Sequence, residues 1–222
     1  MITVVDYGRG NLYSLSHALS HIAVEHVVSE RPEDIHEAAA IVLPGVGAFV
    51  DAMDALASRD LVSPLCDAAA RGVPLLGICL GMQILAAASE EFGARDGLGI
   101  IPGTVRALPE PCGPDGIRIP NMGWRKLVLC REDLLCHGLS QGVMTYFVHS
   151  YGFFAEDDSI VATSDVNGLA VPAVVRRGPV VGCQFHPEKS GPVGLRMLRN
   201  FFAEARLAEL QSPGGCRGGV ND

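Results

Sequence analysis

A cysteine between two glycines, in the stretch from Gly77 to Gly81, is the segment of this sequence best suited to covalent chemistry. Cys79 ends an apolar run, and a nucleophile on a sharp strand-to-helix turn needs small neighbours because the backbone there is strained and crowded. Such a turn exposes the sulfur, favours thiolate over thiol, and leaves the Leu80 N–H free to hold an oxyanion. The alternative is a buried structural cysteine beside two loop glycines.

A second segment, Phe185 to Ser190, offers a base for that nucleophile. Pro187 biases the preceding residue toward extended backbone, in which side chains two positions apart project to the same side. His186 and Glu188 are therefore expected to be neighbours, so that the carboxylate orients an imidazole able to take a proton from a thiol. The order Cys79, His186, Glu188 differs from the nucleophile, acid, base order of α/β hydrolases, which indicates another scaffold.

These motifs resemble the class I glutamine amidotransferases, whose triad is a cysteine elbow followed by a late His-Pro-Glu. Within that class the sequence is most similar to the family of glutaminase subunits of imidazole glycerol phosphate synthase, an enzyme of histidine biosynthesis. Six blocks of the sequence match, and they are residues 6–12, 43–49, 77–83, 122–124, 146–151 and 185–190. The cysteine elbow and His-Pro-Glu mark the whole class, whereas the first, second and fourth of these blocks point to this family.

The resemblance implies an activity and a partner. Glutamine would be hydrolysed to glutamate and ammonia without any cofactor or metal, in a heterodimer with a (β/α)8 barrel cyclase. That partner would use the ammonia to make imidazole glycerol phosphate and aminoimidazole carboxamide ribotide. The implied fold is the flavodoxin-like α/β fold of the class, a mostly parallel doubly wound sheet with antiparallel extensions.

Further site residues follow from the same resemblance. The loop after residues 40–43 would turn the Val46 peptide toward the oxyanion, with Gly45 and Gly47 allowing that peptide to flip. The loop could act as a switch, with the donor turned away until a partner signals; a plain glycine turn is the alternative. One helical turn after Cys79, Gln83 would hold the α-amino or carboxylate group of glutamine. Ser150 and Tyr151 would contribute backbone contacts to the carboxylate.

Residues expected at the partner interface are Asn11, Asn121, Met122, Trp124 and Lys189. The family usually reads Pro-His-Met-Gly-Trp-Asn where this chain has Asn121 and Arg125 at the second and last positions. These departures leave open a paralogous glutaminase subunit that feeds a barrel synthase acting on a nucleotide sugar or another phosphosugar. A catalytically silent interaction module and a stand-alone cysteine peptidase are further alternatives.

Composition agrees with a single-domain enzyme. The chain has 222 residues and a formal net charge of -8, so it lacks the basic footprint of a nucleic-acid-binding protein. Its seven cysteines are odd in number and form no CxxC pair, which favours reduced thiols in the cytoplasm over disulfides or a zinc site. No apolar run reaches the length of a membrane span and no signal segment is evident, so a soluble, non-exported protein is expected.

Short β-branched runs alternate with helical patterns through the first half of the chain and predict a parallel sheet covered by helices. The second half is rich in hairpin-spaced strands, and residues 1–211 are expected to form one domain. A Gly-rich tail over residues 212–222 is expected to be disordered. Expected strands are 2–5, 25–28, 40–43, 74–78, 103–108, 126–129, 144–150, 160–163, 171–176 and 180–185, and the last helix is expected over 192–210.

The Gly8-Arg9-Gly10 turn invites comparison with dinucleotide-binding loops. Tyr13 stands where the third glycine of that motif belongs, which argues against the assignment. The segment is better explained as a tight strand-to-helix turn with Asn11 as the N-cap of the first helix.

Overall fold

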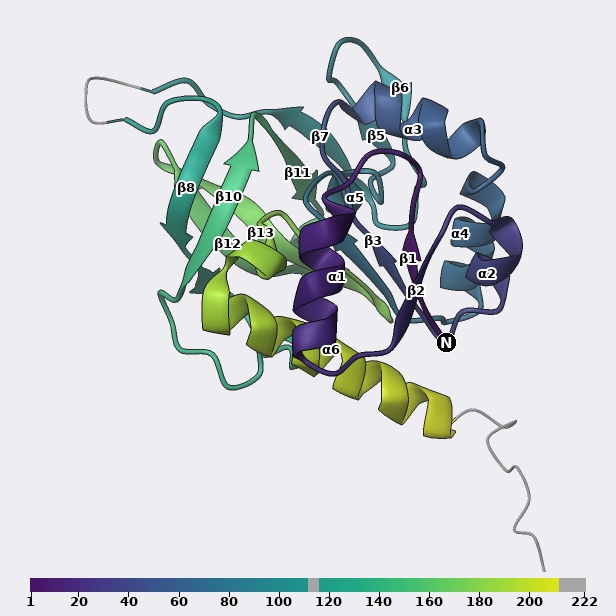
Figure 1. Cartoon of the computed structure of the whole chain (residues 1–222). Helices are drawn as coiled ribbons and strands as arrows, with labels where there is room; N and C mark the ends of the chain where they lie inside the picture. Colours follow the sequence, from purple (N-terminus) through teal and green to yellow (C-terminus); the bar gives the residue numbers. More distant parts are fainter. Residues whose placement is uncertain (112–115, 212–222) are drawn as a thin grey trace, which may run out of the picture.

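The structure is a computed structural model that describes residues 1–111 and 116–211. The predicted tail, 212–222, lies outside the described residues. Within them the chain folds around one large sheet with helices on both faces (Figure 1). None of the helices in the described part is long and apolar enough to cross a bilayer.

The central sheet has eight strands and changes character along its width. The first five strands run parallel, and each of the remaining three pairs antiparallel with the strand before it. This arrangement confirms the expected parallel core with antiparallel extensions. In spatial order the strands are β2 (His26–Ser29), β1 (Ile2–Val5), β3 (Ala40–Leu43), β4 (Leu75–Ile78), β14 (Val180–Cys183), β13 (Leu169–Arg177), β12 (Ile160–Val166) and β9 (Val128–Leu129).

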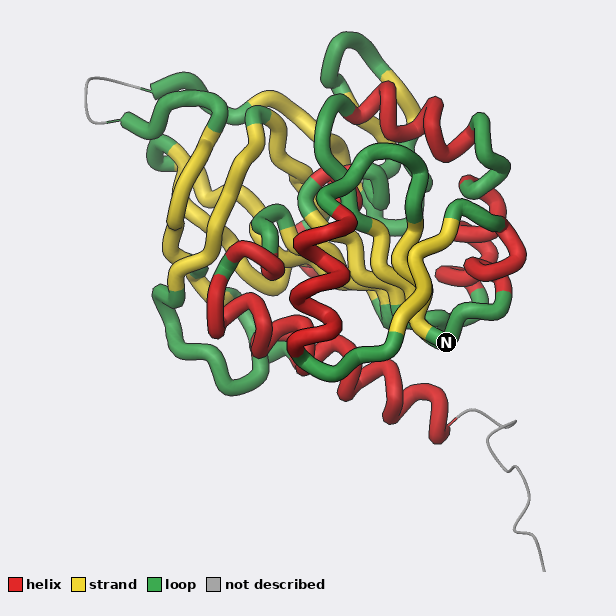
Figure 2. The backbone as a smooth tube through the Cα atoms, in the orientation of Figure 1, coloured by secondary structure: helices red, strands yellow, loops and turns green. Residues whose placement is uncertain are grey.

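Helices α1 (Leu12–His21) and α6 (Gly191–Gln211) contribute to one core, and α2 (Pro32–His36), α3 (Phe49–Ala57), α4 (Val62–Ala70) and α5 (Leu80–Gln83) to a second (Figures 1 and 2). The central parallel strands β3, β4 and β14 are buried on both faces, which is why they read as continuous apolar runs. The sheet thus forms the middle of three layers.

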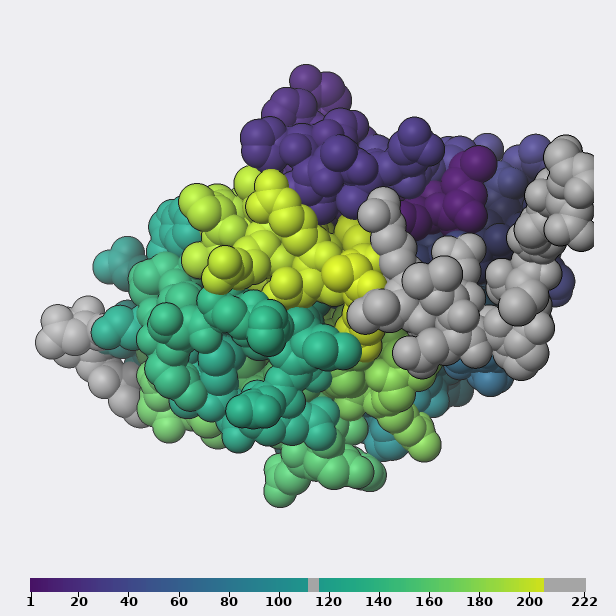
Figure 3. Space-filling model, turned by 90° about the horizontal axis from the view of Figure 1, so that it is seen from below, coloured from purple at the N-terminus to yellow at the C-terminus, as the bar shows by residue number. Residues whose placement is uncertain are grey.

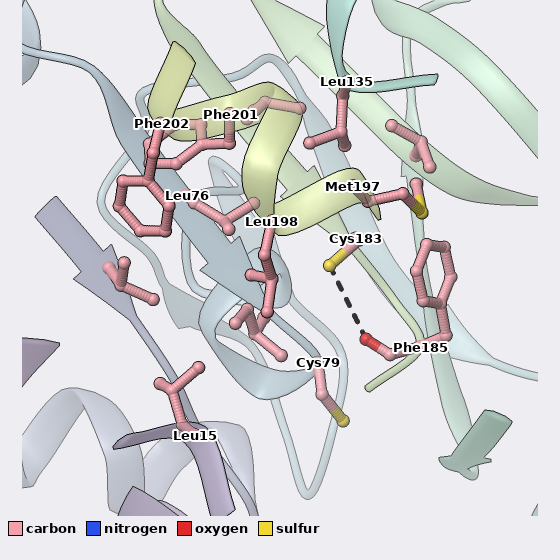
Figure 4. Packing of buried hydrophobic residues seen from close by; sticks show 14 of the residues in the cluster. Leu15, Leu76, Cys79, Leu135, Cys183, Phe185, Met197, Leu198, Phe201 and Phe202 are labelled. Carbon is pink, nitrogen blue, oxygen red and sulfur yellow. Dashed lines mark hydrogen bonds between the residues drawn. The ribbon is translucent and has the colours of Figure 1, made fainter. Parts of the chain in front are cut away.

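Helix α6 packs against the sheet through one apolar stripe, as its spacing predicts. Figure 3 shows the described part of the helix as a yellow band between N-terminal segments and the region that follows β9. Figure 4 shows its aromatic and aliphatic side chains in the cluster, and Cys79 at the border with its sulfur directed away from the helix. Buried members of the stripe are Met197, Leu198, Phe201, Phe202 and Ala205.

Two smaller sheets flank the central one. A ribbon pairs β8 (Asn121–Lys126) with β10 (Met144–His149). The other sheet contains β11 (Tyr151–Ala155), β7 (Gly103–Ala107), β5 (Ala88–Ser89) and β6 (Arg95–Asp96). Three 3-10 turns complete the described elements, η1 (Leu134–Cys136), η2 (Asp157–Ser159) and η3 (Pro187–Lys189).

Strand β8 corrects the sequence-based prediction, which placed a single strand over 126–129. The chain instead forms β8, breaks at Leu127, and enters the central sheet as β9. Leu127 is fully buried and its N–H donates to the Val143 carbonyl, so it anchors the crossing. The β8 sequence carries a glycine and no β-branched residue, and its extended form comes from pairing with β10.

Candidate functional site

Cys79 occupies the strained turn that its flanking glycines predict. Its backbone has φ 57° and ψ −109°, a conformation that non-glycine residues rarely adopt. A Cβ atom at Gly81 would lie 1.8 Å from the Leu43 carbonyl oxygen, and one at Gly77 would lie 2.6 Å from the Gly81 oxygen. Both flanking positions therefore require glycine. Helix α5 is only one turn long, so the helix end supports a thiolate less than the sequence led us to expect.

The nucleophile and the base follow neighbouring parallel strands. Cys79 comes directly after β4, and His186 follows soon after β14. The register pairs Ile78 with Cys183, and the Cys79 N–H donates to the Cys183 carbonyl at 2.8 Å. Parallel strands lie about 4.8 Å apart and end at the same edge of the sheet. The sheet therefore brings together two segments that are a hundred residues apart in sequence.

His186 and Glu188 form the expected pair. The imidazole Nδ1 lies 2.8 Å from Glu188 Oε1, and both side chains are almost completely buried. Burial lowers the pKa of His186, but hydrogen bonds to Cys79 and Glu188 outweigh it and raise that pKa to about 10. The imidazole thus holds its proton tightly beside the sulfur. Glu188 Oε2 is buried and has no hydrogen-bond partner within the described residues.

A pocket of about 280 Å³ opens above the sulfur. This volume suits a small molecule such as an amino acid better than a peptide or a nucleotide. A larger hollow of about 730 Å³ lies between β9 and η1, but it contains none of the predicted site residues. Predicted residues that line the smaller pocket are Val46, Gly47, Cys79, Leu80, Gln83, Ser150, Tyr151, His186 and Lys189.

The predicted oxyanion donors point elsewhere in this structure. The Val46 N–H donates to the Arg9 carbonyl at 3.1 Å, and the Leu80 N–H donates to the Gly45 carbonyl at 3.3 Å. The Gly45 carbonyl therefore accepts the hydrogen bond from the Leu80 N–H that an oxyanion would need. A Cβ atom at Gly45 would lie 2.3 Å from the Tyr7 hydroxyl oxygen, and that hydroxyl donates to the Pro44 carbonyl at 2.7 Å. The loop is held close to the first strand.

A chain of hydrogen bonds connects the pocket to the β8–β10 ribbon. Gln83 Nε2 donates to the Tyr151 carbonyl at 2.8 Å, and His149 Nδ1 lies 2.9 Å from the same oxygen. Asn121 Nδ2 lies 2.9 Å from His149 Nε2, and Arg125 Nε donates to Asn121 Oδ1 at 2.9 Å. Burial lowers the pKa of His149 to about 4, so the ring is neutral and can accept from Asn121 while donating to Tyr151.

Comparison with known proteins agrees with this geometry. A family model described as glutamine amidotransferase class-I matches residues 3–205. The chain belongs to this family. It is 45% identical over 201 residues to the imidazole glycerol phosphate synthase subunit HisH of Bacillus cytotoxicus, covering 90% of this chain and 93% of that protein. HisH of Geobacillus sp. is 45% identical over 203 residues, covering 90% and 95%.

Solved structures of low sequence identity share the fold of this amidotransferase. The structure of PurLQS from Thermotoga maritima superposes with a TM-score of 0.70 at 24% identity, covering 91% of this chain and 97% of that chain. The resemblance and fold class predicted from the motifs are thereby confirmed. The roles of individual residues remain proposals.

Two residues of the amidotransferase site were not anticipated from sequence. Glu91 lines the pocket and accepts a hydrogen bond from the Phe49 N–H at 2.7 Å, and burial raises the pKa of its carboxyl. Nothing in its local sequence distinguishes Glu91 from the adjacent Glu90. Gln184 is fully buried, and its Nε2 donates to the Cys79 sulfur at 3.8 Å. An amide that interrupts an apolar strand just before His186 was a signal that could have been used.

The residues predicted at the partner interface fall into two groups. Met122 and Trp124 lie on the open face of the ribbon, with exposed fractions of 56% and 46%, and Trp124 packs edge-on against Tyr146. Lys189 is exposed at the mouth of the pocket, and Asn11 caps α1 by accepting from the Ser14 N–H. Asn121 differs, because its side chain is fully buried and turned toward His149, so any part it takes in docking is indirect.

Proposed function

We propose that this chain is the glutaminase subunit of an imidazole glycerol phosphate synthase, which releases ammonia from glutamine for a (β/α)8 barrel cyclase. The observation that carries the proposal is the buried His186–Glu188 pair at 2.8 Å beside Cys79, in a pocket of amino-acid size. The identity to HisH subunits over 90% of the chain supports the choice of synthase. A cytoplasmic location fits the cysteines, which are free wherever the structure describes them.

The chemistry proceeds through a thioester. The Cys79 sulfur attacks the side-chain amide carbon of glutamine, a carbon–sulfur bond forms, and the carbonyl electrons move to the oxygen. Protonated His186 gives its proton to the nitrogen as the carbon–nitrogen bond breaks, so ammonia leaves and a γ-glutamyl thioester remains. Water, deprotonated by His186, then hydrolyses the thioester to glutamate. Glu188 orients the imidazole and stabilises its positive charge throughout.

The α-ammonium group of glutamine is expected to bind Glu91 and Gln83. Both hydrogens of Gln83 Nε2 are used, by the Tyr151 carbonyl and by Gln184 Oε1. Only Gln83 Oε1 is left for a ligand, and it can accept from an ammonium but cannot donate to a carboxylate. Backbone groups at Ser150 and Tyr151 remain the proposed contacts for the carboxylate.

The oxyanion donors become available only if the loop rearranges. Rotation of the Gly45–Val46 peptide would free the Leu80 N–H and present the Val46 N–H to the pocket in one movement. Gly47 has a φ of 108°, which glycine adopts without steric cost and other residues do not, so the loop can change its backbone conformation at this position. We propose that docking of the barrel at the ribbon and at Lys189 favours this rotation.

The alternative of a paralogous subunit rested on Asn121 and Arg125, and the structure offers a simpler account of them. The two side chains contact each other at 2.9 Å, so both departures fall in one local hydrogen-bond unit. They help to hold the ribbon through His149, and neither is a member of the triad. We therefore favour the histidine-pathway function for this chain.

The test is reconstitution with candidate barrel proteins. Glutamine-dependent and ammonia-dependent synthesis of imidazole glycerol phosphate should both appear with a barrel cyclase, and glutaminase activity should rise when that cyclase is loaded. Stimulation only by a synthase that acts on a nucleotide sugar would identify the paralogous function. Loss of all glutaminase activity with every partner would leave an interaction module.

A further inference from the structure

We propose that Gln184 holds the Cys79 sulfur for reaction, through a hydrogen bond from its side-chain amide whose direction is fixed by Gln83. The proposal deepens the proposed glutaminase function and rests on it for its kinetic consequences. Its structural part concerns the thiol alone and can be tested without any substrate.

The position of Gln184 shows that its amide is a built part of the site. The residue is 0% exposed, and its N–H continues the sheet by donating to the Ala173 carbonyl at 2.9 Å. Burying an amide in an apolar core is unfavourable unless both of its ends find partners. Gln184 spans the gap between Cys79 Sγ and Gln83 Nε2, at 3.8 Å and 3.0 Å. Each end of the amide therefore meets a group of the active site.

The orientation of this amide follows from donors and acceptors alone. The Tyr151 carbonyl can only accept, so the Gln83 atom that faces it at 2.8 Å must be Nε2. The same nitrogen faces Gln184, which must then present Oε1 to it. The other end of the Gln184 amide, its NH2 group, is left to face the sulfur. A flipped Gln184 would set two NH2 groups against each other.

The donor matters most when the sulfur is charged. As a thiol, Cys79 can donate its proton to the Val148 carbonyl at 3.8 Å. Once the proton has left, that carbonyl repels the thiolate, whereas the Gln184 N–H and protonated His186 attract it. Gln184 thus favours the reactive form and holds the sulfur near the pocket, and its hold weakens when the thioester forms and the charge is gone.

Alkylation of Cys79 in the full chain tests the proposal. Gln184→Met keeps the length of the side chain and removes the donor. We expect Cys79 to react with iodoacetamide at neutral pH about tenfold more slowly in this variant, the factor typical of a hydrogen bond to a charged group. The midpoint of the rate against pH should move upward while the rate at high pH is kept. Titratable groups that interact electrostatically with Cys79 include Tyr7, Cys183 and His186, and the substitution leaves them in place.

Two controls make the result specific. Exposed Cys130 reports the intrinsic reagent rate in the same sample by peptide mapping, and Gln141→Met makes the same chemical change at an exposed site. Should Gln184→Met not fold, Gln184→Glu keeps the shape and the acceptor for Gln83 but sets a carboxylate oxygen against the sulfur, and should slow alkylation above pH 7 as well. An unchanged alkylation profile in a folded Gln184 variant would overturn the proposal. A changed alkylation profile in a chain without glutaminase activity would support the role of Gln184 at the sulfur and would contradict the proposed glutaminase function.

Discussion

The triad and the loop that faces it differ in where their hydrogen bonds go. His186 and Glu188 are hydrogen-bonded to each other, and the imidazole lies close enough to Cys79 for the sulfur to raise the pKa of His186. On the opposite side of the pocket, the Val46 and Leu80 N–H groups are bonded to carbonyls of the protein itself. The chain alone thus assembles the groups that move protons and form bonds, but it keeps the groups that stabilise the transition state occupied.

This difference identifies the part of the site that a partner can control. The triad residues follow closely after the central strands β4 and β14, so their movement would disrupt the core. The loop has Val46 41% exposed and a glycine on either side of it, so its peptides can rotate without moving the core once the hydrogen bonds to the Arg9 carbonyl and from the Leu80 N–H are given up. Control of glutamine hydrolysis is therefore expected to act on the oxyanion donors and to leave the nucleophile unchanged.

The largest effect is expected from the nucleophile. Cys79→Ser should lower glutamine-dependent synthesis by about four orders of magnitude or more, because no other group can form the thioester. Ammonia-dependent synthesis by the same complex should be retained, since the barrel performs that step. A parallel loss of both activities, measured as product formation with either nitrogen source, would contradict the assignment. A glutamine analogue with a diazo ketone should label Cys79 and spare Cys183.

The two partners in the triad should differ in importance. His186→Ala should reduce glutaminase turnover by about two orders of magnitude more than Glu188→Gln, because the imidazole carries the proton and the carboxylate only orients it. Steady-state rates of folded complexes provide the comparison. Equal losses would show that the division of roles is wrong.

Freeing the two oxyanion donors should raise turnover by at least about two orders of magnitude, since one such donor alone usually contributes that much. We expect this rise in glutaminase rate when the barrel is bound and loaded with its own substrate or an analogue. Over the same change, the alkylation rate of Cys79 should vary less than about threefold, because the nucleophile is already in place. A free chain as fast as the loaded complex would instead be an autonomous amidase.

Variants at the proposed docking surface test whether the partner controls the loop and not the triad. Trp124→Ala or Lys189→Ala should weaken the stimulation by the partner more than it lowers the basal rate, because both side chains lie on the proposed docking side. Leu169→Ala, at an exposed leucine on β13, is the matched control and should leave stimulation intact. Equal loss of partner stimulation in all three variants would show that the ribbon is not part of the docking surface.

Substrate binding should respond to Glu91 by about one order of magnitude. Glu91→Gln removes the charge proposed to hold the α-ammonium, so KM for glutamine should rise about tenfold with little change in kcat. Glu90→Gln, at the exposed neighbour, is the control. A fall in kcat alone would place Glu91 outside the substrate contacts.

The smallest expected effect is on stability. Burial keeps His149 neutral, with a folded pKa of about 4 against 6.5 when unfolded, so the unfolded chain binds more protons between these values. The stability that His149 contributes is full above pH 6.5 and is lost as the pH falls toward 4. By pH 5.5 this loss is about 1 kcal/mol. His149→Gln should reduce the fall in unfolding free energy by that amount, as measured by urea denaturation at each pH.

Sequence reasoning located the parts of the site that depend on local backbone. The elbow, the N-cap at Asn11 and the His186–Glu188 pair each follow from steric rules that act within a few residues. Strand β8, Glu91 and the buried place of Asn121 were missed because each is decided by a partner distant in sequence. A carboxylate such as Glu91 looks like any surface acid until Phe49 and the pocket wall surround it.

The parallel pairing of β4 with β14 has a consequence for slow motions of the molecule. Amide protons in these two central strands should be among the last to exchange with deuterated solvent, since each strand is paired on both sides. Peripheral hairpins and the loop at Val46 should exchange through much smaller openings. Cys79 and His186 therefore keep their relative positions during fluctuations that rearrange the rest of the pocket. The oxyanion donors can be exposed and covered again many times without moving these two residues.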